Sequence, residues 1–139
     1  MGRHDLTMIR NVLMIGRWSV EFYFCPDGYD VDELLDRLYS LGASAGVLRE
    51  AMSLMESGRP NTGFTFPNPY EYEAIVAVGP TTSGDEFVNT FTHEIHHLAG
   101  AIAGALGVDL EGETPAYIAG DSARELASVV CRLGCSHCG

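Results

Sequence analysis

Hydrophobic and polar positions alternate near the start of the chain and then change to a helical spacing. Residues 17–25, RWSVEFYFC, alternate and are rich in aromatic and β-branched side chains, which predicts a strand. The turn-forming run Pro26-Asp27-Gly28 follows it. Apolar residues spaced three and four apart then predict two helices, over about 31–41 and from Ser44 to Glu56.

The middle of the chain carries two short strand patterns, Gly63 to Phe66 and Tyr72 to Val78, with a hairpin-like connection at Pro67-Asn68-Pro69. A long helix is predicted from Asp85 to Leu106, because acidic residues suit its first turn and Gly107 suits its C-cap. Thr114-Pro115 is a helix-start signal and predicts a last helix over about 113–133.

This order of elements, β-α-α-β-β-α-α, predicts an α+β fold in which a short mixed or antiparallel sheet packs on helices. The length of 139 residues suits a single domain spanning 1–139. Residues 1–7 and 134–139 are candidate disordered tails.

Composition narrows the classes of function. The formal net charge is −11, and the basic residues are all Arg and form no cluster, which argues against a nucleic-acid partner. Arg10, Arg17 and Glu21 interrupt the apolar runs near the N-terminus, so we expect no signal peptide, no membrane span and a cytoplasmic location. The oligomeric state stays open.

The run His93-Glu94-Ile95-His96-His97 carries the clearest chemistry in the chain. It matches H-E-x-x-H, with His93 and His97 four residues apart on a predicted helix. Residues i and i+4 lie on one helix face, so the two imidazoles can bind one metal ion. Glu94 is then placed to accept a proton from a water molecule at that metal.

The motif helix carries two stripes. One is apolar and consists of Phe91, Ile95, Leu98, Ile102 and Leu106. The other places the two histidines in line with Gly100, Ala101 and Gly104. Small residues there predict close approach of a neighbouring helix, and the glycines are equally compatible with ordinary helix packing.

A catalytic zinc ion takes three protein ligands and keeps one position for water. Glu113 lies sixteen positions after His97, across a glycine-containing turn, at the start of the predicted last helix. This spacing favours Glu113 as the third ligand, with Glu111 as a competitor.

The segments HEIHH and GETPAYIAGD together resemble the gluzincins, zinc metallopeptidases in which H-E-x-x-H is joined by a downstream Glu on a second helix. Glu113-x-x-Ala116 is similar to the E-x-x-small element of that family, and the compact size resembles small ImmA/IrrE-like and phage-encoded metallopeptidases. The similarity covers about 85–121. It implies a zincin-like domain with His93, His97 and Glu113 as Zn²⁺ ligands and Glu94 as general base.

Position 117 departs from the pattern of those families. It is Tyr here, whereas thermolysin-like members carry Asp and ImmA-like members carry Asn. Tyr117 lies one turn beyond Glu113, so its hydroxyl is a candidate to orient a ligand or to stabilise an oxyanion, and a packed aromatic ring is the alternative. Asp121 is a candidate to hydrogen-bond the second ring nitrogen of a ligand histidine, and the alternative is that Asp121 is a solvated helix residue. We expect His96 not to be a ligand.

The four cysteines are Cys25 and the C-terminal group Cys131, Cys135 and Cys138, next to His137. Their spacing allows a structural metal site. The simpler interpretation is a buried Cys131 followed by a reduced tail.

The sequence thus predicts a zinc-dependent hydrolase that cleaves peptide bonds. We expect the strand over 72–78 to lie nearest the motif helix and to bind an extended peptide by edge pairing. The alternative is a zincin-like metal-binding module without peptidase activity that acts in assembly or regulation. A third class is a structural protein whose tail cysteines hold the only metal.

Overall fold

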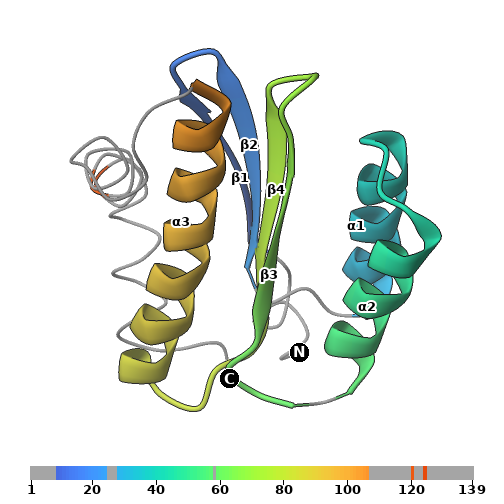
Figure 1. Cartoon of the computed structure of the whole chain (residues 1–139). Coiled ribbons are helices and arrows are strands. Elements are labelled where there is room, and N and C mark those ends of the chain that lie inside the picture. The colour runs from blue at the N-terminus through green and yellow to red at the C-terminus, as the bar shows by residue number, and fades with distance from the viewer. Residues whose placement is uncertain (1–8, 25–27, 58, 107–119, 121–123, 125–139) are drawn as a thin grey trace.

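A computed structural model describes residues 9–24, 28–57, 59–106, 120 and 124 of the chain. In this part the strands are β1 (Ile9–Ile15), β2 (Trp18–Phe24), β3 (Gly63–Asn68) and β4 (Glu73–Val78), and the helices are α1 (Gly28–Ser40), α2 (Ala45–Glu56) and α3 (Gly84–Leu106). Figure 1 shows three layers, with α3 on one face of the sheet and with α1 and α2 on the other. The predicted α+β class is confirmed.

The sheet is mixed, and its strand order is β1-β2-β4-β3. The pairs β1–β2 and β3–β4 are antiparallel, whereas β2–β4 is parallel. Consequently β4 is an inner strand with a neighbour on each side, and β3 lies at an edge of the sheet.

Alternation along the strands divides the core into two clusters. The cluster under α3 contains Trp18, Val20, Phe22 and Phe24 of β2, Ala74, Val76 and Val78 of β4, and Phe87, Phe91, Ile95, Leu98 and Ile102 of α3. The cluster under α1 and α2 contains Tyr23, Ile75 and Ala77 of the sheet, with Phe64 and Phe66 of β3 packed against it. Successive strand residues point to opposite faces, so each inner strand supplies both cores.

The sequence did not predict β1. Its Val12 and Met14 side chains are 56% and 62% exposed, while Leu13 and Ile15 pack partly against the α3-side core. Apolar residues therefore occupy both faces of β1, and the period-two signal of a half-buried strand is missing. The two-residue loop to β2 uses Gly16 at a φ of 59°, a left-handed conformation that glycine adopts without strain.

The remaining predicted elements are close to the observed ones. Ser44 is the N-cap of α2, and its hydroxyl accepts a hydrogen bond from the N–H of Val47. The strand predicted to end at Phe66 continues through Pro67 to Asn68. The last helix, predicted over 113–133, lies outside the described residues except for Gly120 and Arg124, and both of these positions are helical. Among helices of the described ranges, none has the length and apolar character needed to cross a bilayer.

A polar cluster fastens α1 to the sheet. Arg37 of α1 donates from Nε and Nη2 to Oε2 of Glu21 at 3.0 and 2.7 Å, and its Nη2 also lies 3.4 Å from Oε1 of Glu73. The hydroxyl of Tyr23 donates to Oε1 of Glu21 at 2.7 Å. Hydrogen bonding to Glu21 raises the pKa of Arg37 above its usual range, so the guanidinium stays charged.

We expect Arg37→Met to destabilise the fold by about 2–3 kcal/mol. It removes one partner of a largely buried ion pair, and the estimate stands below the full range for buried pairs because the Arg37 side chain is 31% exposed. Urea unfolding measures the effect. Arg49→Met, at an exposed position of α2, is the control and should change stability by less than about 0.5 kcal/mol. Equal losses in the two variants would contradict a special role for Arg37.

Candidate metal centre

Helix α3 carries the motif, and its first turn is capped by Ser83. The N–H of Glu86 donates to the Ser83 hydroxyl at 3.1 Å, and the N–H of Phe87 donates to the Ser83 carbonyl at 2.9 Å. The predicted apolar stripe is confirmed at the four positions whose side chains are described: Phe91, Ile95, Leu98 and Ile102 are all buried. Burial of this stripe fixes the rotation of the helix about its own axis.

His93 and His97 project from the exposed flank of α3, one turn apart. Their Nε2 atoms lie 3.1 Å apart, and the ring centroids are 4.6 Å apart with the planes at 85°. Two nitrogens bound to one tetrahedral zinc ion are separated by about 3.3 Å, so this donor pair fits such an ion. The same distance suits a hydrogen bond between two neutral rings, in which one nitrogen donates and the other accepts.

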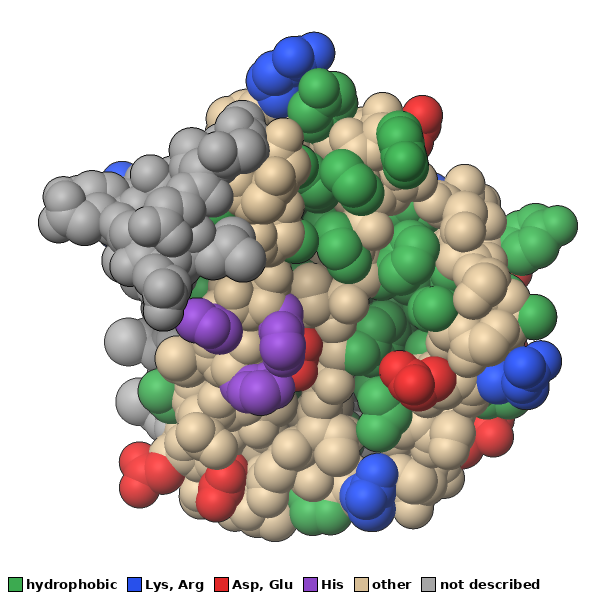
Figure 2. All heavy atoms as spheres, viewed as in Figure 1, with side chains coloured by type: hydrophobic (Ala, Val, Ile, Leu, Met, Phe, Trp, Pro, Cys, Tyr) green, Lys and Arg blue, Asp and Glu red, His purple; other side chains and the backbone are tan. Residues whose placement is uncertain are grey.

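Figure 2 shows histidine side chains gathered on the surface over α3, with hydrophobic side chains gathered beside them on the same face. His96 is also exposed, and its ring centroid is 6.4 Å from that of His97. This separation is wider than the 4.6 Å of the His93–His97 pair.

Glu94 differs from the histidines because its side chain is buried, at 4% exposure. Oε1 accepts a hydrogen bond from the Thr65 hydroxyl at 2.7 Å. Within the described residues no ion pair joins Glu94 to a basic side chain. An unpaired carboxylate is costly to bury, so packing alone does not account for Glu94 at this position.

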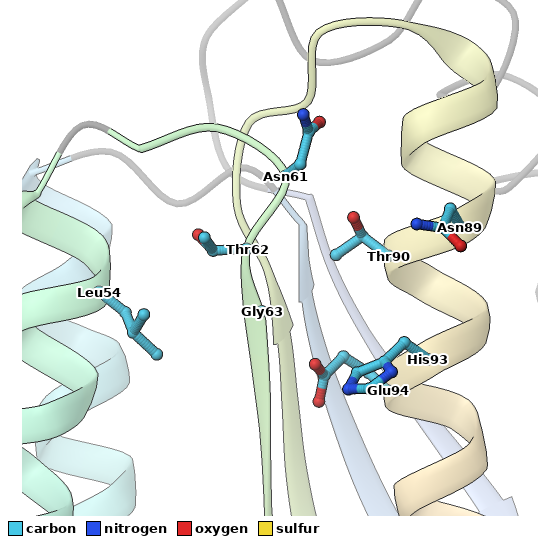
Figure 3. Close-up of a pocket in the computed structure, with 8 residues that line it drawn as sticks. All are labelled: Leu54, Asn61, Thr62, Gly63, Asn89, Thr90, His93 and Glu94. Carbon is cyan, nitrogen blue, oxygen red and sulfur yellow. The ribbon is translucent and has the colours of Figure 1, made fainter.

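The carboxylate of Glu94 and the ring of His93 both project from α3 toward β3 (Figure 3). Two hollows of about 280 and 400 Å³ adjoin each other there, and both are lined by Gly63, His93 and Glu94. The smaller hollow extends to Asn61 and Thr90, and the larger extends to Pro67 and His97. The motif therefore opens into a cleft between α3 and the edge strand.

Among the strands of the described residues, β3 lies at an edge, and its outer backbone groups border this cleft. The N–H of Gly79 donates to the carbonyl of Thr62, which makes the next pair, Gly63 with Val78, a non-hydrogen-bonded pair of the ladder. By alternation, Gly63, Thr65 and Pro67 direct their backbone N–H and C=O groups away from β4. Proline has no N–H to donate, so at a position facing β4 it would remove one hydrogen bond of the ladder. At this outward-facing position Pro67 leaves the ladder intact.

The expectation that strand 72–78 binds a peptide at its edge is wrong. That strand, β4, pairs with β2 on one side and with β3 on the other, so its hydrogen-bonding groups are used within the sheet. The available edge next to the motif is β3. No local pattern indicates this arrangement, because pairing of β4 with both neighbours depends on the parallel crossover from β2.

The candidate third ligand Glu113 lies outside the described residues, as do Glu111, Tyr117, Asp121 and the four cysteines. Within the described ranges, His, Cys, Asp and Glu side chains form no group of three suited to a metal ion. His93 and His97 thus stand as a pair of donors. A Cβ placed on Gly100 or Gly104 would meet no described atom within 4 Å, and the predicted neighbouring helix lies outside the described residues except for Gly120 and Arg124.

Thr65 and Gly63 were missed by the sequence reasoning. They lie about thirty residues before the motif, and a threonine and a glycine in a short strand are too common to indicate a site. The alternation of β3, with Phe64 and Phe66 toward the other core, is the signal that places Thr65 on the α3 side.

Comparison with protein-family models, with curated proteins and with solved structures found no match for this chain.

We expect the purified protein to bind one equivalent of Zn²⁺, and His93→Ala and His97→Ala to weaken that binding by more than about 100-fold. Loss of a group that only supports a ligand costs about 10–100-fold in affinity, and loss of a ligand should cost more. Isothermal titration calorimetry measures the affinity. His96→Ala, on the same helix, is the control and should bind as the wild type does. If His93 and His97 only form a hydrogen bond with each other, the wild type would bind zinc no more tightly than the variant that carries both His93→Ala and His97→Ala.

Proposed function

We propose that this protein is a zinc-dependent peptidase in which His93, His97 and Glu113 hold the metal and Glu94 acts as general base. The observation that carries the proposal is the pair of Nε2 atoms 3.1 Å apart beside a buried carboxylate that lines the same cleft. A bound zinc ion would supply Lewis acidity, which lowers the pKa of a coordinated water to about 7 and polarises a substrate carbonyl.

Glu94 supplies the proton transfer in this proposal. Its Oε1 is engaged by Thr65, and no hydrogen bond from the described residues engages Oε2. Oε2 can therefore accept a proton from a water molecule in the cleft and return it to the leaving amine when the peptide bond breaks. The low exposure of the carboxylate limits competing bulk water and strengthens its electrostatic interactions with the reacting groups.

The edge of β3 favours an extended peptide as substrate over a small amide. Gly63 and Thr65 each present an N–H and a C=O, and Pro67 presents a C=O, along the border of the larger hollow. A substrate strand that pairs with these groups has its backbone beside Glu94 and the two histidines. Pairing of this kind recognises backbone and tolerates many side chains, which suits a peptidase.

We expect Glu94→Gln to keep zinc and to lower kcat by about 10²–10⁴-fold. Gln is nearly the same size as Glu but cannot accept the proton. The measurements are zinc content and cleavage of a peptide library by the full-length protein. Glu56→Gln, at an exposed position of α2, is the control and should cleave as the wild type does. Zinc binding without cleavage of any peptide by the wild type would instead favour a metal-binding module that acts in assembly or regulation.

Pairing with β3 predicts a period-two pattern when the backbone amides of a cleaved peptide are N-methylated one at a time. Methylation of an amide that faces β3 removes a hydrogen bond and adds a clash, and it should raise KM roughly tenfold, which corresponds to about 1.4 kcal/mol. Methylation one residue further along, where the amide faces away, should leave KM nearly unchanged. If only methylation of the scissile amide impairs cleavage, and KM is unchanged for methylation elsewhere, β3 does not pair with the substrate.

A further inference from the structure

Thr65 makes a contact that the proposed proton transfer does not itself require. Its Oγ1 lies 2.7 Å from Oε1 of Glu94 and 3.2 Å from the backbone carbonyl oxygen of the same residue. A hydroxyl has a single proton, and an ionised carboxylate is the stronger acceptor, so Thr65 donates to Oε1. This contact joins residues 29 positions apart, on β3 and α3.

Gly63 lets the carboxylate come this close to β3. A Cβ at that position would lie 2.6 Å from the carbonyl oxygen of Ala77, 3.1 Å from Cγ of Glu94 and 3.4 Å from its Oε2. Any larger residue would therefore push on both β4 and the Glu94 side chain. The α3-facing side of β3 thus accommodates the Glu94 side chain, because Gly63 leaves space for it and the Thr65 hydroxyl donates a hydrogen bond to it.

We propose that Thr65 is a positioning residue that fixes the orientation of the Glu94 carboxylate. This inference rests on the proposed function. By binding Oε1, the hydroxyl removes rotational freedom from a side chain with three rotatable bonds and leaves Oε2 toward the cleft. Without the hydroxyl the carboxylate keeps its burial but loses its direction, and misplacement of a catalytic group by about 1 Å can cost roughly 10²-fold in rate.

The kinetic test compares Thr65→Val with Thr65→Ser in the full-length protein loaded with zinc. Valine keeps the shape and removes the hydroxyl, so kcat should fall about 10–100-fold while KM and zinc content stay at wild-type values. Serine keeps the donor and should restore most of kcat. Thr92→Val, at an exposed position on α3, is the matched control and should not change kcat. A wild-type kcat for Thr65→Val would overturn the proposal.

A second measurement does not depend on activity. Thr65→Val should lower the urea midpoint in the wild-type background, because it leaves a buried carboxylate without its donor, and should lower it less in the Glu94→Gln background. Equal shifts in both backgrounds would overturn the coupling between Thr65 and Glu94. A wild-type protein that cleaves no peptide would overturn the proposed function, and the unfolding cycle would still decide whether Thr65 holds this carboxylate.

Discussion

The site depends on how α3 is held against the sheet. Phe87 and Phe91 of α3 contact Phe24 with ring centroids 6.0 Å apart, and Phe91 also lies 6.5 Å from Phe22. Aromatic rings of this size leave few alternative ways to pack, so they fix the rotation of the helix. A helix with 3.6 residues per turn then places Glu94 about 60° and His97 about 120° around from Phe91. The same contacts that bury the core therefore turn the carboxylate toward β3 and leave the imidazoles at the surface.

The register of β3 is the second constraint. Gly63, Thr65 and Pro67 face α3, while Phe64 and Phe66 pack on the core under α1 and α2. A shift of one residue would exchange these sets and bring a phenylalanine against Glu94. Burial of Phe64 and Phe66 in the core under α1 and α2 thus selects the register that places the Thr65 hydroxyl against the Glu94 carboxylate. One alternating pattern both stabilises the sheet and arranges the site.

Much of this architecture follows from local sequence signals. The strong 3.6-residue periodicity of 85–106 predicts α3 within one residue at its start, and the H-E-x-x-H spacing predicts that His93 and His97 come together. Two features of the sheet do not follow from local sequence signals. Strand β1 carries apolar residues on both faces, so its pattern is ambiguous, and the parallel pairing of β2 with β4 joins segments some fifty residues apart. Because β3 becomes the edge only through that pairing, neither its role nor the contact of Thr65 with Glu94 is visible in the sequence.

Pro67 has a consequence for what the sheet can do with a bound strand. An edge with a full run of N–H groups would let any extended chain keep adding hydrogen bonds, which favours permanent capture and fibrous growth. Proline removes the donor at one of the three outward positions of β3 and so limits how long a docked strand can be. A strand held by so few hydrogen bonds dissociates readily. The edge is therefore suited to reversible binding of short extended segments and poorly suited to self-association.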